Sequence, residues 1–555
     1  MSAPSTPRAD GEVKLHGAAV YGTDLAAPGM LWGALVLAPV AHGTIRSLDL
    51  APARAVRGVV AVGPEAEVRR TAPTGTEVVP LGGRLVLPGL IDGHLHLGDL
   101  ARFRDDLNLT EVHGREDFER KLREWAAVHP TGPIVGRGLD VDRSLAGHWP
   151  LATDLDRIVS DRPLVVYHTS GHAAVVNGFV LSATGLEESP ADELEGRVGT
   201  TPDGRPNGIL YEEALRVANS QIALPVRPEQ ALRTLEFLAS FGLTTVASMN
   251  VPPEELALLR GLAVEGRLPI RVRAYVRLLR VAEIRAPDLA PVGPPARFAV
   301  VGAKGFTDGA FGPRTAWLSA PYSDSPERNG LAVESDETLS SALAMANDRG
   351  LAPALHAIGD RAVVRAAHLL APYAHREGAR ARIEHAGLTL PSTLSALATD
   401  RPALVVQPGF VWSDSWLSER LGAERVRWAY AFRTLADLGH RLVGSSDAPY
   451  DPPDPWRGLR AATERRDGLG RSANPDPHET LAFEEAVRLY GSHAGEVLGE
   501  PSLGSLEVGS PADLVVVDAT SLSEAIHLGA MGVRETWVGG VRVSGSGASG
   551  PGGSR

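Results

Sequence analysis

The sequence predicts an α/β fold, in which a (β/α)8 barrel of the TIM type is combined with a β-sandwich formed from both termini and with an α+β insertion. Apolar runs of strand length alternate with helix-like stretches over about 400 residues, a pattern typical of parallel α/β architecture. Roughly 250 residues are enough for an eight-stranded barrel, so the excess predicts an insertion. Residues 100–225 are dense in Asp, Gly and Pro and are the best place for it.

The two ends of the chain differ from its middle. Residues 1–12 and 546–555 are rich in Gly, Ser and Pro, and we expect them to be disordered. Residues 13–86 and 500–545 contain short apolar runs separated by Gly and Pro, as strands and turns do. Because chain ends often lie close in space, we expect these two segments to form one composite β-sandwich. Residues 87–499 then form the barrel with its insertion.

The individual elements follow from apolar runs and their flanking breakers. We expect strands at residues 84–87, 164–167, 244–247, 270–275, 298–303, 352–355, 381–384, 403–406 and 442–444. We expect helices at residues 115–128, 228–241, 253–265, 336–349, 360–377, 392–398 and 483–498.

Composition excludes several classes of function. The chain of 555 residues carries a net charge of −12, which disfavours a nucleic-acid binder and a polybasic membrane anchor. It has no cysteine, so disulfides, thiolate catalysis and Cys-ligated metal sites are excluded. No run reaches the roughly 18 apolar residues of a membrane span, and the N-terminus lacks the apolar segment of a secretory signal. We therefore expect a cytoplasmic protein with neither nucleic acid nor membrane as a partner.

Four motifs carry groups that bind metals. His94 and His96 follow an apolar run and a proline, and in extended chain they point to the same side, although two nearby histidines are often only polar loop residues. His356 and His385 each end an apolar strand, where a capping or core histidine is the alternative. Asp447 follows another apolar strand. It could be a metal ligand and proton acceptor, with a turn residue as the alternative.

Lys304 lies in a fifth motif of this kind. Arginine has replaced lysine almost everywhere in this chain, and the lysines are Lys14, Lys121 and Lys304. Lys304 ends a strongly apolar strand, where desolvation favours the neutral amine. A neutral amine can combine with carbon dioxide to give a carbamate, which an always-protonated arginine cannot do. The alternative is a buried ion pair with Asp308 or Glu384.

Each of these motifs lies at the carboxyl end of a predicted strand. In a (β/α)8 barrel those ends converge on one mouth, where active sites form. One shared metal centre explains this placement better than independent coincidences do.

With these residues the chain resembles the amidohydrolase superfamily, and within it the YtcJ-like branch that includes N-substituted formamide deformylases. The resemblance rests on the ordered set of His94, His96, Lys304, His356, His385 and Asp447, and on the stretches PLVVYHTSGHAAVVN, KGFTDGAFGPRTA and GSLEVGSPADLVVVD. It departs from the branch at Ser170 and Val175, where an acidic residue and a tryptophan are usual.

The resemblance implies one or two divalent metal ions, with zinc preferred and manganese, iron or nickel as alternatives. His94, His96 and Asp447 would hold the inner ion, His356 and His385 the outer ion, and carboxylated Lys304 would bridge them. Metal-activated hydroxide would then attack the carbonyl of a small N-acyl or N-formyl amine. Asp447 would act as general base and then as general acid toward the leaving nitrogen.

Candidates for substrate contact are fewer and weaker. His172 from the insertion and Arg314 could contact substrate polar groups, with a structural ion pair as the alternative for Arg314. Trp317, with Phe311, Trp412 and Trp416, could form an apolar wall or simply belong to the core.

The sequence leaves other functions open on the same scaffold. These are a metal-dependent isomerase or deaminase, and a catalytically degenerate binding protein. It does not fix the oligomeric state, and a homodimer stays open.

Overall fold

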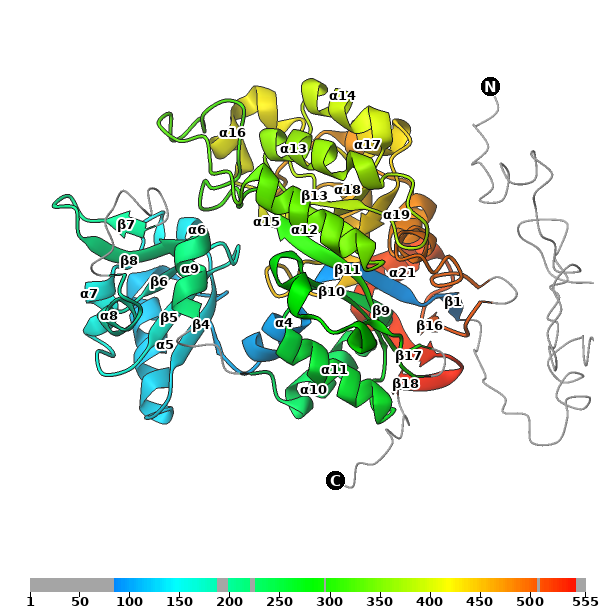
Figure 1. Cartoon of the computed structure of the whole chain (residues 1–555), viewed down its shortest axis with the longest axis horizontal. Coiled ribbons are helices and arrows are strands. Elements are labelled where there is room, and N and C mark those ends of the chain that lie inside the picture. Colours follow the sequence, from blue (N-terminus) through cyan, green and yellow to red (C-terminus); the bar gives the residue numbers. More distant parts are fainter. Residues whose placement is uncertain (1–83, 187–197, 220–224, 294–295, 507–509, 546–555) are drawn as a thin grey trace, which may run out of the picture. The chain divides into compact units, whose positions relative to one another are not determined.

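The computed structural model describes residues 84–186, 198–219, 225–293, 296–506 and 510–545 (Figure 1). At its centre is a barrel of eight parallel strands that pair in chain order. The strands are β2 (Leu90–Leu95), β9 (Leu243–Val251), β10 (Arg271–Arg277), β11 (Phe298–Phe306), β12 (Ala352–Ala357), β13 (Arg382–His385), β14 (Ala403–Val406) and β15 (Leu442–Gly444). The TIM-type barrel predicted from the sequence is confirmed.

Backbone hydrogen bonds join the first and last strands of the barrel just beyond their carboxyl ends. The Asp447 amide donates to the His94 carbonyl at 2.8 Å, and the His96 amide donates to the Ala448 carbonyl at 2.8 Å. This closure brings two predicted site segments, 350 positions apart in sequence, into direct contact.

The barrel interior is filled with side chains and is narrow. A Cβ atom at Gly93 would lie 2.4 Å from Val443 Cγ1, and one at Gly302 would lie 2.2 Å from the Tyr275 ring. Glycine at these positions therefore leaves room for the side chains of the neighbouring strands.

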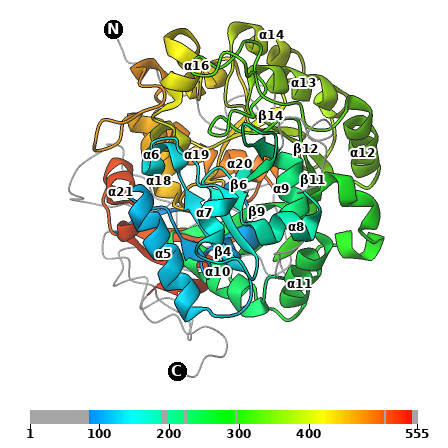
Figure 2. The same cartoon turned by 90° about the vertical axis from the view of Figure 1, so that its left-hand side faces the viewer.

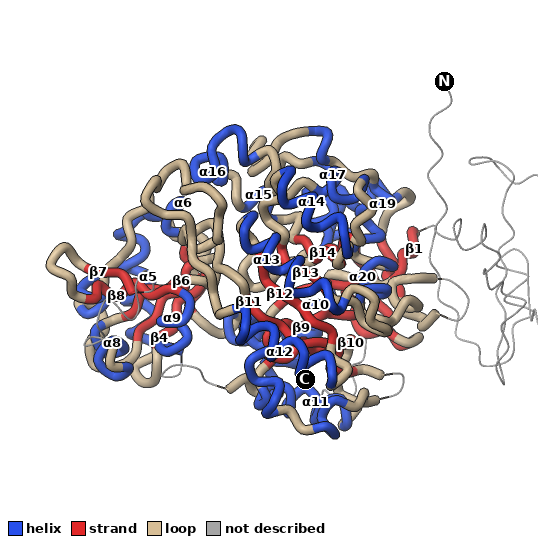
Figure 3. The backbone as a smooth tube through the Cα atoms, turned by 45° about the horizontal axis from the view of Figure 1, so that its top comes forward, coloured by secondary structure: helices blue, strands red, loops and turns tan. Residues whose placement is uncertain are grey.

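Helices surround the barrel strands, as Figure 3 shows. Along α13, the buried residues Ala362, Val363, Ala366 and Leu370 recur at three- and four-residue spacing, so one face packs on the barrel. The helices that accompany the barrel and the C-terminal sheet are α4 (Leu97–Phe103), α10 (Pro228–Ser240), α11 (Pro253–Val264), α12 (Asp336–Asp348), α13 (Asp360–Leu370), α14 (Pro391–Asp400), α15 (Phe410–Ser413), α16 (Leu417–Val426), α17 (Phe432–Asp437), α18 (Pro455–Glu464), α19 (Phe483–Leu489), α20 (Ser492–Val497) and α21 (Leu522–Leu528).

A four-stranded antiparallel sheet combines strands from both ends of the described chain. Its order is β1 (Leu85–Pro88), β16 (Leu514–Val517), β17 (Val533–Val538) and β18 (Val541–Gly545). The strand expected at residues 84–87 thus belongs to this sheet, and the barrel begins with β2. The rest of the predicted sandwich segment 13–86 and the predicted disordered ends, 1–12 and 546–555, lie outside the described residues.

Between β2 and β9 the chain forms a second, mixed sheet. Its order is β3 (Leu107–Asn108), β4 (Ile134–Leu139), β5 (Leu164–His168), β6 (Ala173–Val176), β8 (Pro206–Tyr211) and β7 (Val198–Thr200). It is accompanied by α5 (Gly114–Val128), α6 (Val141–Leu145), α7 (Ala152–Asp156), α8 (Gly178–Thr184) and α9 (Glu212–Asn219). The sheet and α5 share an apolar core of their own, which includes Phe118, Leu122 and Val166. In Figure 1 this insertion, in cyan, lies beside the barrel as a separate layer of sheet and helices, and in Figure 2 it lies in front of the barrel.

Two expected helices end earlier than predicted. The stretch 483–498 forms two helices, because Gly491 has non-helical backbone angles (φ −132°, ψ −113°). The stretch 360–377 leaves the α-helix after Leu370 and enters a 3-10 turn that contains Pro372. Within the residues that the structure describes, no helix is both long and apolar enough to cross a membrane.

Candidate active site

The six predicted ligands all lie at the carboxyl end of the barrel. His94 belongs to β2, Lys304 to β11 and His356 to β12, while His385 is the last residue of β13. His96 precedes α4 directly and Asp447 follows β15 by three residues. The sequential order of parallel strands brings these positions to the same rim.

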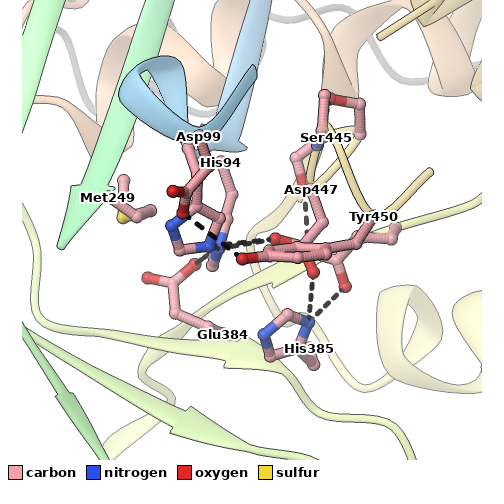
Figure 4. Close-up of polar contacts among 12 residues, drawn as sticks. His94, Asp99, Met249, Glu384, His385, Ser445, Asp447 and Tyr450 are labelled. Carbon is pink, nitrogen blue, oxygen red and sulfur yellow. Dashed lines mark hydrogen bonds and ion pairs between the residues drawn. The ribbon is translucent and has the colours of Figure 1, made fainter. Parts of the chain in front are cut away.

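His94, His96 and Asp447 form the tightest group. Asp447 Oδ1 lies 3.1 Å from His94 Nε2 and 3.3 Å from His96 Nε2, and the two Nε2 atoms are 3.4 Å apart. Even so, the buried Oδ1 atom has no hydrogen-bond partner of acceptable geometry. Figure 4 shows His94 and His385 pointing toward Asp447, with Glu384 on the other side of His94.

Glu384 determines the tautomer of His94. Its Oε2 lies 2.7 Å from His94 Nδ1, and its carboxylate also accepts hydrogen bonds from Arg382. The charged partner lowers the pKa of Glu384 despite its burial, so the carboxylate is an acceptor and His94 Nδ1 carries the proton. The lone pair of His94 Nε2 therefore points at the carboxylate oxygen of Asp447. Two acceptors at this distance repel each other unless a cation lies between them.

His385 and His356 are oriented in the same way by acceptors. His385 Nδ1 lies 2.8 Å from Gln407 Oε1, and the amide of Gln407 donates to Ser445 Oγ at 2.9 Å. His356 Nε2 lies 3.0 Å from the carbonyl of Gly309. Each of these contacts leaves the other ring nitrogen with its lone pair. The two rings lie side by side, with centroids 4.5 Å apart.

Burial keeps these imidazoles neutral. It lowers the pKa of His385 to about 3, with further lowering by His94 and Lys304. It also lowers the pKa of His356 and, more weakly, that of His96. Neutral imidazole is the form that ligates a metal. For Asp447, burial raises the pKa, but positive charge placed against the carboxylate, as when His94 or His96 is protonated, outweighs burial and holds the pKa well below its usual range.

Lys304 is buried at the same rim. Burial lowers its pKa to about 8, although Glu384 and Asp447 oppose the shift. No side-chain ion pair or hydrogen bond of Lys304 occurs among the described residues, and its Nζ lies 4.6 Å from the centre of the Phe306 ring. The ion-pair alternative with Asp308 or Glu384 is therefore not formed, and roughly a tenth of the amine is neutral at pH 7, far more than for an exposed lysine.

His172 reaches the rim from the insertion. Its ring centroid lies 4.9 Å from that of His356, and its Nδ1 lies 3.0 Å from Glu212 Oε2. Burial opposes the charged form of His172, but Glu212 outweighs it and raises the pKa of His172. The Glu212 contact leaves His172 Nε2 to face the site.

Two cavities meet at the predicted ligands. Both are lined by His172, His356, His385 and Asp447. The larger, of about 440 Å³, has an aromatic and aliphatic wall that includes Phe103, Phe311, Phe410, Trp412, Trp416 and Tyr430. The smaller, of about 230 Å³, is polar and includes His96, Glu212, Asn250, Arg277 and Lys304.

The structure does not bring Arg314 or Trp317 to either cavity. Arg314 donates to the carboxylate of Asp324, which also pairs with Arg420, so Arg314 is in a structural ion pair. The ring of Trp317 stacks against Arg361, with 4.2 Å between the guanidinium carbon and the ring centre. Proximity to a motif in sequence did not determine where these side chains point.

Sequence reasoning missed three residues that orient the site, namely Glu384, Gln407 and Glu212. From the sequence, Glu384 is expected only as a partner for Lys304, although its place next to His385 in a buried strand is a usable signal. Gln407 and Glu212 carry no local signal, because their contacts span 22 and 40 positions.

The donor set fits a divalent metal ion. Ligand atoms of His94, His385 and Asp447 all lie within 4.8 Å of one another. Neutral imidazoles and an ionised carboxylate are ligands for zinc and similar ions. A cation between His94 Nε2 and Asp447 Oδ1 would also satisfy the orphaned carboxylate oxygen.

Comparison with known proteins agrees with this geometry. The model of the amidohydrolase family matches residues 77–544. The chain belongs to the amidohydrolase family. A model of the aldehyde oxidase and xanthine dehydrogenase a/b hammerhead domain matches residues 16–80, which lie outside the described residues.

Similar proteins include the putative amidohydrolase YtcJ of Bacillus subtilis (strain 168), 29% identical over 80% of this chain and 85% of that protein. N-substituted formamide deformylase of Arthrobacter pascens is 25% identical over 87% of this chain and 92% of that protein. A solved structure of an uncharacterised metal-dependent hydrolase from Pyrococcus horikoshii OT3 is 31% identical over 83% of this chain and 92% of that one, with a TM-score of 0.67. This amidohydrolase is therefore a hydrolase with a candidate metal site.

Proposed function

We propose that this amidohydrolase cleaves a non-peptide C–N bond in a small N-acyl or N-formyl amine, with one or two divalent ions as cofactor. The observation that carries the proposal is the approach of His94 Nε2, His96 Nε2 and Asp447 Oδ1 to within 3.4 Å of one another, with the buried Asp447 Oδ1 left without a hydrogen-bond partner. The deformylase named above, which by its name acts on N-substituted formamides, supports the bond type.

His94, His96 and Asp447 would hold one ion, and His356 with His385 would hold a second. Lys304 would bridge them as a carbamate, formed when its neutral amine adds to carbon dioxide and releases a proton; its pKa of about 8 supports this. A divalent cation bound there lowers the pKa of water and supplies hydroxide at neutral pH.

The protein residues supply the remaining steps. Asp447, held ionised by positive charge beside it, takes the proton of the attacking water and returns it to the leaving nitrogen. His172 lies beside His356 and directs Nε2 into the site, where it can donate to the carbonyl oxygen as charge develops.

The two cavities indicate how a substrate is oriented. The aromatic wall of the 440 Å³ cavity suits an aryl or branched alkyl substituent. The 230 Å³ polar cavity suits a small acyl or formyl group and its product carboxylate. We therefore propose that the bulky amine portion occupies the first and the acyl portion the second.

The test is a screen of N-formyl, N-acetyl and aryl amides with added zinc or manganese, with both products identified. Formation of equal amounts of carboxylate and amine supports the proposal. Release of ammonia or an isomer of unchanged mass would replace it with one of the alternative reactions.

Lys304→Arg tests the bridge, and Lys121→Arg, on α5 of the insertion, is the matched control. We expect Lys304→Arg to lose activity and metal while the fold is kept. Full activity in Lys304→Arg would rule out the carbamate.

A further inference from the structure

The opposite end of the barrel holds a cavity that the proposed chemistry does not use. It has a volume of about 320 Å³, and its lining contains many cationic side chains. These are Arg380, Arg401, Arg433, Arg441, Arg488, His440 and His493, with Glu485 as an acidic member. Leu442, Leu481 and Leu489 form its buried apolar floor.

The barrel places these arginines together. Arg380 precedes β13 by two residues, Arg401 precedes β14 by two, and Arg441 precedes β15 by one. Because these neighbouring parallel strands are each preceded by an arginine, positive charge collects at the amino-terminal rim of the barrel. α17 and α19 add Arg433 and Arg488 beside them.

Acidic residues neutralise only part of this charge. Arg380 and Arg441 share Glu496, at 2.9 and 3.0 Å, and Arg433 pairs with Asp437 and Glu485. No ion pair of Arg401 or Arg488 is found among the described residues. The cavity is therefore positively charged, although the net charge of the whole chain is −12.

His440 supplies a second, independent observation. It is 6% exposed, and neither of its ring nitrogens has a hydrogen-bond partner of good geometry among the described residues; its one backbone contact, with Pro402, is poorly aligned. A buried imidazole always carries at least one N–H, and leaving it unpaired costs free energy unless a ligand accepts from it. Burial and then the charge of Arg401 lower the pKa of His440, and the weak contact with the Pro402 carbonyl only partly opposes this shift.

We propose that this cavity binds a small phosphate-bearing anion, held by Arg401, Arg488 and the N–H of His440. Guanidinium groups bind phosphate oxygens through paired, charge-assisted hydrogen bonds. The volume admits inorganic phosphate or a small phosphate monoester. The site is separate from the carboxyl-end rim and does not depend on the proposed reaction.

Isothermal titration of the metal-loaded protein with inorganic phosphate or glycerol 3-phosphate tests this, at ionic strength matched with sodium chloride. We expect saturable binding that Arg401→Gln and Arg488→Gln each weaken about tenfold or more. His440→Phe should also weaken it while the fold is kept. Arg285→Gln, at a side chain that is 80% exposed, removes the same charge elsewhere and should change nothing.

Two results would overturn the proposal. One is the absence of phosphate binding, or binding that the Arg401→Gln/Arg488→Gln double variant leaves unchanged. The other is tighter binding of succinate than of either phosphate compound, which would assign the cavity to carboxylates instead.

Discussion

Replacing Glu384 by glutamine tests whether one buried carboxylate orients the metal site. Glu384 has no exposed surface, and it accepts hydrogen bonds from Arg382 at 2.6 and 3.3 Å and from His94 Nδ1 at 2.7 Å. Glutamine keeps the shape of the glutamate side chain but leaves the buried Arg382 without a counter-charge. Removing one partner of a buried ion pair costs about 3–5 kcal/mol. We expect the Glu384→Gln variant to lose that much free energy of unfolding.

The same variant should weaken metal binding. With a neutral amide beside Nδ1, His94 is free to take the other tautomer, which places a proton on the Nε2 atom that faces Asp447. Loss of such an orienting partner typically lowers metal affinity about 10–100-fold.

Urea unfolding of the metal-free protein and competition with a chelator measure the two effects separately. Glu254→Gln is the control, because Glu254 is 63% exposed and 3.8 Å from Arg280, a pair worth less than about 1 kcal/mol. If Glu384→Gln loses no more than Glu254→Gln and keeps its metal affinity, the proposed orientation of His94 is wrong.

Three further outcomes follow from the structure. Burial raises the pKa of Glu255 from 4.5 to about 7, so the folded state keeps its proton while the unfolded state loses it. Stability should therefore fall by on the order of 3 kcal/mol between pH 4.5 and 7 relative to Glu255→Gln, as measured by paired urea titrations. Gly93→Ala should lower the free energy of unfolding by about 1–3 kcal/mol, because its Cβ would lie 2.4 Å from Val443, and an unchanged urea midpoint would contradict that. Chelation should lower the thermal midpoint, with about 4 kcal/mol lost when metal had been present at 1,000 times its dissociation constant; an unmoved midpoint would count against a resident ion.

The convergence of His94, Lys304, His356, His385 and Asp447 was predictable from the sequence. Each residue follows an apolar strand, and parallel strands paired in chain order leave their carboxyl ends at one rim. For Lys304, His356, His385 and Asp447 only strand positions were needed, and the strands at residues 403–406 and 442–444 were predicted with the bounds that the structure has. The strand that carries His94, β2, was not among those predicted. The roles of these residues as ligands stay predictions.

Side-chain direction was not predictable in the same way. Arg314 and Trp317 follow Lys304 by ten and thirteen positions and were expected at the substrate, yet they contact Asp324 and Arg361. A loop has no period that fixes the direction of its side chains, so its contacts depend on tertiary packing. The same limit hid Glu212, which reaches His172 across two strands of the insertion.

In the proposed function the metal ligands and most of the residues that select the substrate come from different parts of the chain, with His172 of the insertion as the exception. The predicted ligands come from barrel strands, whose geometry is fixed by the closed sheet. The wall of the 440 Å³ cavity also includes Asp140, Arg143 and His168 from the insertion. An ion pair between Arg420 and Asp142 joins the insertion to the barrel domain. Because the ligands do not depend on these wall residues for their position, changes in the insertion can alter the substrate without disturbing the metal site. Substrate identity should therefore be sought in the insertion, and reaction type in the barrel.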